Sequence, residues 1–521
     1  MAQGNKWAAM LVVIIGTFMA ILDGSIVNVA LPKMMAVLNT TQDQIEWVLT
    51  AYMLTLGVVM PITGFLGDRF GSKSMYLLSL TCFTVGSAFC GLAWDVNSLI
   101  AARVIQGIGG GVLTPLGMAI IYKAFDRSEI GMALGIWGIS AMAAPAIGPT
   151  LGGYIVEFLN WRLIFLINVP IGVLNVMLGW FLLRESVKVQ GQAFDLVGLV
   201  TSVLGFSTLL YAISNGNSEG WDAPLIVGLL MVSAICLITL VVHELEHPEP
   251  ILDFRLFRNP TFTLSLFLAS INAMGLFGAL FMIPFFLETL RGLSAMEVGM
   301  LLFPSAIASG IAMPISGWLF DRIGPKLVVT IGLIIVTLTT YKLSTLNLVT
   351  PFSSLMWWFG FRGLGVGLSM MPASTAGMNT VHPSMINRAS ALSNVIRQVA
   401  AAFGVALFST IMQQREVFHF QHSLISVQMG GAQAFETMNA YSQTLLHNGY
   451  SPAVIPALST GGLIGLIKQQ ALASAITDCF MVATLILASG IIPALFLKDV
   501  RRRPGAMAAK SEGSTAAIAA E

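Results

Sequence analysis

Charged residues are scarce in this sequence. Of its 521 residues, only 10% are charged and 56% are hydrophobic, whereas an ordinary soluble domain carries about 25% charged residues. A soluble fold of this length needs a polar surface that so few charged side chains cannot supply. Lipid is therefore the expected solvent for most of the chain.

Other features are missing as well. The 26 basic and 25 acidic residues give a net charge of +1, which argues against a nucleic-acid partner. The four cysteines all lie in apolar runs, so they predict buried side chains and not a disulfide framework or a metal site. The six histidines lie in loops or at predicted helix ends, which excludes a membrane redox enzyme with haem held by paired histidines inside helices.

The sequence contains no complete nucleotide-binding motif. The segment Gly64–Lys73 superficially resembles a phosphate-binding loop, but it lacks the Gly-Lys pair and no strand precedes it. The glycines at 107, 109, 110 and 111 lie in a predicted membrane span, which excludes a dinucleotide-binding fold. We therefore expect no enzyme and no cofactor, and an ion gradient remains as the energy source.

Long apolar runs dominate what is present. A helix needs about 20 mostly apolar residues to cross a bilayer, and stretches with one charge or none predict an all-α integral membrane protein with fourteen spans. The predicted spans are 8–31, 46–66, 75–94, 98–121, 132–156, 162–183, 196–214, 223–242, 262–287, 298–319, 327–346, 353–378, 388–412 and 472–497. The alternative is twelve spans, with 196–242 outside the bundle. The first apolar run has no small-residue cleavage site, which favours a retained span over a signal peptide.

Basic residues in the predicted loops give the orientation. With the N-terminus in the cytoplasm, seventeen of the 26 basic residues fall in inside loops and tails, six fall outside, and three (Arg103, Arg362 and Arg397) fall within helices. This distribution obeys the positive-inside rule. Both termini are therefore predicted to be cytoplasmic.

The sequence also contains an internal repeat. Gly64–Lys73 recurs as Gly317–Lys326, and Arg103–Gly109 is echoed by Arg362–Gly367 on the corresponding helix. The repeat predicts two pseudo-symmetric six-helix bundles around a two-helix insert, a 6+2+6 layout typical of transporters with substrate between the halves. The predicted boundaries are 1–183 for the first bundle, 184–261 for the linker with two extra helices, 262–498 for the second bundle with an outer loop at 413–470, and 499–521 for a cytoplasmic tail.

Five segments together resemble one family. They are Leu22–Pro32 in the first helix, the loop Gly64–Lys73, Arg103–Gly107 in the fourth helix, Pro145–Gly153 in the fifth helix, and Asn160–Gly172. With these motifs in this order, the chain resembles the major facilitator superfamily (MFS), and within it the fourteen-helix drug:H+ antiporters of the EmrB/QacA type. Gly24 and Ser25 depart from the residues often found in that first-helix motif.

The resemblance implies proton-driven multidrug efflux by alternating access, in the cytoplasmic (inner) membrane of a bacterium. Expected substrates are amphipathic, lipophilic cations, and the alternative is an MFS exporter or importer specific for one metabolite. A periplasmic adaptor and an outer-membrane channel are candidate partners, because EmrB-like pumps act with them whereas QacA-like pumps act alone. The resemblance also assigns an antiporter motif to the fifth helix, where Gly138, Pro145, Gly148, Pro149, Gly152 and Gly153 would pack closely and bend the span so that it seals against leak.

Ionisable residues within spans are the candidate coupling residues. Asp23 is predicted about eight residues from the outer end of its helix, roughly 12 Å deep at 1.5 Å per residue, and Arg103 is predicted about five residues inside the outer end of the fourth helix. Placing such a charge in a membrane helix costs about 2.5–3.5 kcal/mol and marks a transport pathway by default; the alternative is an ion pair that only ties two helices together. The predicted coupling and substrate residues are Asp23, Asn28, Arg103, Gln106, Arg362 and Asp478. A structural role for Arg362, or an interfacial one for Asp478, is also compatible with the sequence.

The repeated loops predict a conformational latch. Gly64, Asp68, Arg69 and Gly71 recur in part as Asp321 and Arg322 in the second copy. Carboxylates and cations at helix ends can hold one conformation closed, and by the resemblance these loops stabilise an outward-open state. Topogenic charge alone would explain Lys73 and Lys326, but not the repeated Asp and Gly.

The segment 413–470 is predicted to lie outside the membrane. It carries four acidic or basic residues and three histidines, of which His419 and His422 could share a helix face. No third ligand accompanies them, so no metal site is expected there. We predict a partly helical cap or a docking surface for a partner.

Overall fold

A computed structural model of the chain describes residues 6–126, 129–188, 195–428, 432–447, 451 and 454–498. All regular elements in this described part are helices. The α-helices before the insert are α1 (Lys6–Leu38), α2 (Gln42–Val59), α3 (Thr63–Phe70), α4 (Ser72–Leu92), α5 (Val96–Ala124), α6 (Ile130–Phe158), α7 (Leu163–Leu166) and α8 (Asn168–Leu182). The insert is α9 (Leu196–Glu219) and α10 (Pro224–Glu246).

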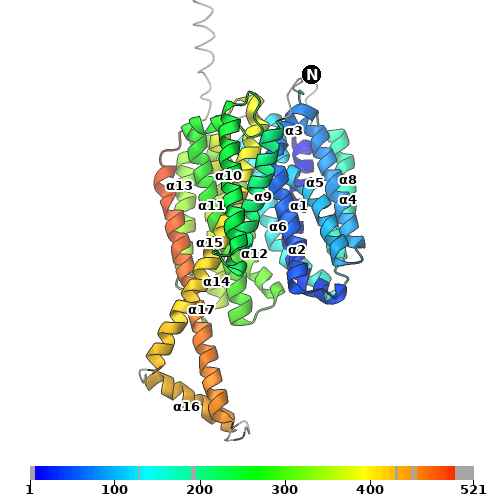
Figure 1. Cartoon of the computed structure of the whole chain (residues 1–521). Coiled ribbons are helices and arrows are strands. Elements are labelled where there is room, and N and C mark those ends of the chain that lie inside the picture. Colours follow the sequence, from blue (N-terminus) through cyan, green and yellow to red (C-terminus); the bar gives the residue numbers. More distant parts are fainter. Residues whose placement is uncertain are drawn as a thin grey trace, which may run out of the picture.

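The second set of α-helices is α11 (Pro260–Phe285), α12 (Ala295–Ile323), α13 (Pro325–Leu343), α14 (Phe352–Met378), α15 (Ile386–Gln428), α16 (Ala432–His447), α17 (Ile455–Ser489) and α18 (Ile491–Ala494). Short 3-10 turns at Met60–Ile62, Phe254–Arg258 and Pro383–Met385, and a π turn at Phe286–Leu290, join or extend them. The helices stand side by side in one bundle, and α15, α16 and α17 project from one end of it (Figure 1).

Fourteen spans can be traced among the described residues. Twelve helices are long and apolar enough to cross a membrane, and the pair α2–α3, bent by 56° at a break that contains Pro61, adds a thirteenth. The fourteenth is α14, which has 27 residues but is less apolar because it contains Arg362 and many Gly and Ser residues. Helices suit this role because each one satisfies its own backbone groups where water is absent.

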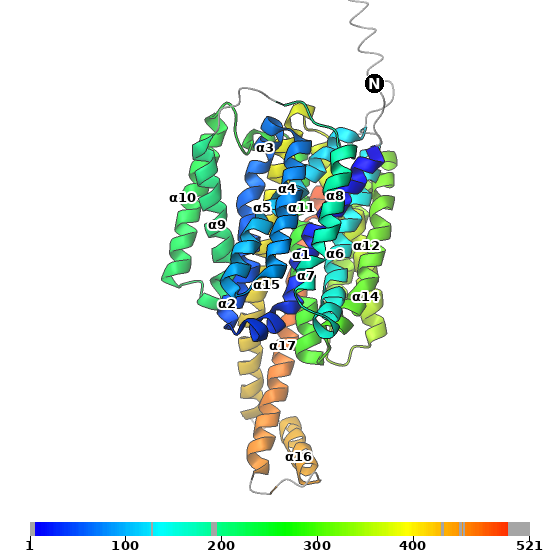
Figure 2. The same ribbon diagram turned by 90° about the vertical axis from the view of Figure 1, so that its right-hand side faces the viewer.

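The two helices of the insert run alongside the other spans of the bundle. This argues against the alternative of twelve spans with 196–242 outside the bundle. Helix α9 packs against α2 and α15, and α10 packs against α9 on the outer side (Figure 2). Asn217 Nδ2 donates to Ser409 Oγ at 3.0 Å, and Trp221 Nε1 donates to Thr410 Oγ1 at 3.0 Å, so the insert is tied to α15. The outward side of α10 leaves Ile235 66% exposed, as expected of a face that meets lipid.

Both copies of the repeated loop contain a glycine at a position where the backbone has a positive φ. Gly71 precedes α4 with φ of 96°, and Gly324 precedes α13 with φ of 85°. This left-handed region strongly favours glycine. The same sharp turn therefore separates the second and third spans of each half.

The segment 413–470 is more helical than a loop. Helix α15 has 43 residues and α17 has 35, so both run well beyond the predicted spans 388–412 and 472–497. Together with α16 they form a projecting hairpin, which we call the outer hairpin (α15–α17 beyond residue 412 and before residue 472). Its helical character agrees with the predicted partly helical cap.

Candidate functional site

A buried ion pair lies at the centre of the first half. Arg103 on α5 donates from Nη1 to Asp23 Oδ2 on α1, and both side chains are 0% exposed. The same guanidinium donates from Nη1 to Gln106 Oε1 at 2.7 Å and from Nε to the Val48 carbonyl oxygen at 3.0 Å. Three of the predicted coupling residues, Asp23, Arg103 and Gln106, are therefore brought together.

The second oxygen of Asp23 is also saturated. Its Oδ1 accepts from Gln106 Nε2 at 2.8 Å and from Asn168 Nδ2, at the start of α8, at 3.1 Å. Gln106 Nε2 contacts Ser87 Oγ at 2.7 Å as well. Both carboxylate oxygens of Asp23 are therefore occupied by side-chain donors from α5 and α8.

Aromatic rings close the pocket around the guanidinium. Arg103 Cζ lies 4.0 Å from the centroid of the Tyr52 ring and 5.6 Å from that of Phe165. Tyr52 in turn donates its hydroxyl to the Ala20 carbonyl oxygen at 3.1 Å. Asp23 is 0% exposed in this conformation, so the pocket must open before water or substrate can reach it.

Asn168 is the member of this cluster that the sequence did not single out. It lies in Asn160–Gly172, a segment whose sequence indicates the family and gives no separate role to Asn168. A neutral amide within a span has neither a charge nor a motif spacing from which contact with Asp23 could be predicted. Its position on Asp23 is therefore a finding of the structure.

Replacing Asn168 with alanine should destabilise the folded protein. The change removes one donor to a buried carboxylate, and hydrogen bonds to charged groups contribute about 1.5–3 kcal/mol. The apparent unfolding temperature in detergent should fall by several degrees. Asn28→Ala is the matched control, because Asn28 is exposed and its amide donates within its own helix, to the Gly24 carbonyl oxygen at 3.3 Å; an equal loss in both variants would contradict this assignment.

Among the described residues of the second half, Arg362 has no carboxylate partner like the one that Arg103 has in Asp23. Arg362 on α14 is buried and donates from Nη2 to the Gly275 carbonyl oxygen on α11 at 2.7 Å. Helices α11 and α14 correspond to α1 and α5 in the repeat, so a backbone carbonyl receives Arg362 where Asp23 receives Arg103. Among the described residues, the buried Asp–Arg pair thus occurs in the first half alone.

Asp478 and Asn28 lie apart from Asp23. Asp478 on α17 has a side chain 34% exposed, and its Oδ2 accepts from Arg415 Nε at 2.6 Å and from His419 Nε2 at 2.8 Å on α15. These contacts join the two long helices where the outer hairpin begins. His419, considered above as half of a metal pair, is engaged by this carboxylate.

The repeated loops make reciprocal contacts between the halves. In the first half, Asp68 on α3 accepts from Asn387 Nδ2 at 2.6 Å and lies 3.5 Å from Arg388 Nε, both on α15. In the second half, Asp321 on α12 accepts from the backbone N–H groups of Gly131 and Met132 on α6, each at 3.2 Å.

Each carboxylate thus lies at the N-terminal end of a helix that belongs to the opposite half, where the helix dipole favours negative charge. We call this end of the bundle the latch end; α1 begins at the same end, where Lys6 contacts Glu129 (Figure 1). Arg69 stacks near Phe65 and Phe70, with 5.7 Å from its Cζ to each ring centroid, and Arg322 stacks on Trp318 at 4.1 Å.

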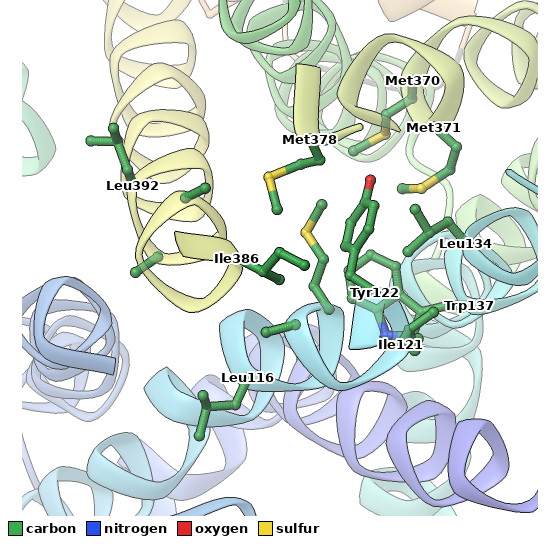
Figure 3. Close-up of a cluster of buried hydrophobic side chains, with 14 of the residues drawn as sticks. Leu116, Ile121, Tyr122, Leu134, Trp137, Met370, Met371, Met378, Ile386 and Leu392 are labelled. Carbon is green, nitrogen blue, oxygen red and sulfur yellow. The ribbon is translucent and has the colours of Figure 1, made fainter. Parts of the chain in front are cut away.

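Apolar side chains from both halves fill the space next to the latch end (Figure 3). The first half contributes Tyr122 and Trp137, and the second half contributes Met371 and Met378; all are buried. Trp137 Nε1 donates to Thr17 Oγ1 at 3.1 Å, which fixes the ring. The two halves are therefore in apolar contact at the latch end.

The fifth span, α6, packs against α1 of its own half and against α12 of the other half. Its small residues allow both helices to approach closely. A Cβ on Gly138 would lie 2.7 Å from Met313 Sδ on α12, whereas a Cβ on Gly148 would lie 2.1 Å from Ser25 Oγ on α1. Gly152 faces α1 in the same way, at 2.9 Å from Ile26 Cγ1, and Gly153 is more open. Pro145 and Pro149 both lie inside this helix. Close packing explains the glycines; the predicted seal against leak stays a prediction.

Comparison with known proteins identifies the family to which this chain is similar. The family profile of the Major Facilitator Superfamily matches residues 13–405. An uncharacterized MFS-type transporter of Bacillus subtilis, YhcA, is 35% identical over 96% of this chain and 94% of its own length. A multidrug resistance protein B homolog of Mycobacterium tuberculosis is 31% identical over 93% of this chain and 89% of its own.

Among solved structures, the human organic anion transporter MFSD10 (TETRAN) superposes with a TM-score of 0.57 at 14% identity, covering 93% of this chain and all of that one. At that identity the likeness concerns the fold alone. The sequence matches, by contrast, extend over nearly the whole chain. The chain is a multi-pass membrane transporter that belongs to the major facilitator superfamily.

Proposed function

We propose that this protein is a proton-driven exporter of amphipathic, cationic small molecules that works by drug:H+ antiport and alternating access. The observation that carries the proposal is the buried Asp23–Arg103 pair, which has no counterpart with a carboxylate among the described residues of the second half. A single buried acid of this kind suits the binding and release of one proton. The multidrug resistance name of the M. tuberculosis relative supports export of drugs.

The proposed cycle starts from the arrangement seen here. The halves are latched at one end by Asp68 and Asp321, and we infer that this end faces the cytoplasm because the predicted inside loops are rich in basic residues. The structure then corresponds to a state closed toward the cytoplasm. Both termini would lie on that side, in a bacterial cytoplasmic membrane.

Protonation of Asp23 would remove its attraction for Arg103. A neutral carboxyl group attracts the guanidinium less strongly than a carboxylate does. Arg103 could then move with α5 relative to α1. Because Asp23 is fully buried, proton and substrate would compete through this movement and not by direct contact in the state described. No cofactor is required, since the proton gradient supplies the energy.

The substrate would bind between the halves, as in other transporters built from two repeats. Asn28 lies five residues beyond Asp23 on α1 and is exposed, so we assign its amide to the substrate path. A lipophilic cation near α1 would favour the charged form of Asp23 electrostatically. Substrate arrival would in this way promote release of the proton.

Purified protein in proteoliposomes tests this function. With an imposed pH gradient, a fluorescent lipophilic cation should move against the proton flux, and collapse of the gradient should stop it. Dye movement that ignores the pH gradient would defeat the antiport mechanism. Movement of neutral or anionic compounds alone would point to a different substrate class.

The outer hairpin is proposed to couple the transporter to a partner. Its helices project beyond the bundle (Figures 1 and 2), whereas the Asp23 cluster and the latch lie within the bundle. Shortening it beyond the Arg415–Asp478 contact should spare transport in vesicles and lower drug resistance of whole cells. Equal loss in both assays would show that the hairpin belongs to the transport core, and equal activity in both would show that no periplasmic adaptor docks there.

A further inference from the structure

A cluster of acids and histidines closes the insert at the latch end and takes no part in the proposed transport cycle. Asp195 directly precedes α9, while His243, Glu244 and His247 lie at the end of α10. His243 Nε2 lies 2.8 Å from Asp195 Oδ1. One ligand atom each from Asp195, His243 and His247 lies within 4.8 Å of the other two.

Two buried carboxylate oxygens in this cluster have no partner among the described residues. Asp195 is 3% exposed and Glu244 is 0% exposed, yet Asp195 Oδ2 and Glu244 Oε2 accept no hydrogen bond from them. Both side chains converge over Gly198, where a Cβ would lie 2.3 Å from Asp195 Oδ2 and 2.6 Å from Glu244 Oε1. Two like charges buried so close together are costly, and a proton or a bound cation is needed to offset that cost.

The other contacts orient these groups and leave their free oxygens available. Asp195 Oδ1 also accepts from the Gly198 N–H at 2.8 Å, and Glu244 Oε1 accepts from the Leu252 N–H at 3.4 Å. His247 Nδ1 accepts from the Glu249 N–H at 3.2 Å, a contact that metal binding at that atom would replace. Backbone donors of this kind commonly fix the ligands of metal sites.

We propose that Asp195, His243 and His247, beside the buried carboxylate of Glu244, bind a divalent transition-metal ion of the zinc class. Two imidazoles four residues apart share one helix face and can bind one ion. Two imidazole nitrogens with one carboxylate oxygen suit Zn²⁺ better than Ca²⁺ or Mg²⁺, which prefer oxygen alone. His243 is 30% exposed along its side chain, so the ion can enter from the water at the latch end.

The bound ion would clamp the start of α9 to the end of α10. Helix α9 packs between α2 of the first half and α15 of the second, and α15 carries Arg388 of the latch. The ion would therefore stabilise the position of the insert beside the latch end. Transport itself does not need this clamp, so metal binding and transport can be measured separately.

Zinc titration of the purified full-length protein tests the site. The protein should carry no polyhistidine tag and should first be stripped with a chelator. Competition with a chromogenic zinc indicator should then reveal about one tightly bound ion per chain. Asp195→Asn and His243→Ala should each weaken binding by about tenfold or more, as removal of a ligand or its supporting partner does elsewhere.

His422→Ala is the matched control, because His422 belongs to a second pair of neighbouring histidines on the outer hairpin. Zinc should raise the unfolding temperature of the wild type and of this control, but not that of His243→Ala. If Asp195→Asn fails to fold, His247→Gln at the partly exposed end of α10 replaces it. Binding that His422→Ala abolishes and His243→Ala leaves intact, or no saturable binding at all, would overturn the proposal.

Discussion

Asp23→Asn should abolish proton-coupled efflux while the protein still folds and inserts. Asparagine keeps an oxygen that can accept from Arg103 and removes a buried charge, but it cannot bind and release a proton. Arg103 retains Gln106 Oε1 and the Val48 carbonyl oxygen as acceptors and the Tyr52 ring as a cation–π partner. Dye efflux driven by a pH gradient in proteoliposomes should fall to the level of empty vesicles.

Asp222→Asn is the matched control for this variant, because it makes the same chemical change at an exposed carboxylate between α9 and α10. It should transport like the wild type. Arg103→Ala should also impair efflux, whereas Arg103→Lys should keep part of it, since lysine retains the charge without the planar fork. Robust pH-driven efflux by Asp23→Asn at normal expression would refute the role of Asp23 and move the assignment to Asp478.

Gly317→Ala should force the halves apart at the latch end. A Cβ at this position would lie 2.0 Å from the Gly131 carbonyl oxygen, 2.4 Å from its carbon and 2.8 Å from Met132 Cα. All three are backbone atoms of α6, so no side-chain rotation relieves the overlap. Overpacking costs about 1–3 kcal/mol and each 1.4 kcal/mol is a factor of ten, so the latched population should fall by a factor of about five to about one hundred relative to the open one.

Spin labels measure this shift directly. Labels at Lys188→Cys and Lys326→Cys, in a background without the native cysteines, report the separation of the halves at the latch end. The distance distribution should lengthen in Gly317→Ala, and efflux should fall with it. Gly228→Ala is the matched control, because nothing lies within 4 Å of a Cβ there; an unchanged distribution in Gly317→Ala would contradict the assignment of this contact to the latch.

Much of the fold could be predicted because lipid leaves a simple record in the sequence. Charge-free runs of about 20 residues located the spans, and the repeat of Gly64–Lys73 at Gly317–Lys326 related the halves. Helix ends were less accessible, because hydropathy records only the part of a helix that lies in lipid. For that reason α15 and α17 extend far beyond the predicted spans, into a segment described from sequence as an outer loop.

The site was predicted where it contains charge. Asp23 and Arg103 were found because ionisable residues are costly at that depth in a membrane, and Gln106 through its motif. Asn168 could not be found in this way, since a neutral amide has no such cost. The partners of Asp68 could not be found either, because Asn387 and Arg388 lie more than 300 residues away and nothing in local spacing relates them to it.

Measurement of proton release on substrate binding tests most directly whether Asp23 carries the proton that is exchanged for substrate. Purified protein in weakly buffered detergent solution, mixed with a lipophilic cation near neutral pH, should release protons that a pH indicator detects. The wild type should release close to one proton for each cation bound, and Asp23→Asn should release none while still binding the cation. Equal proton release by the two proteins would contradict the account, because the exchanged proton would then reside on another group.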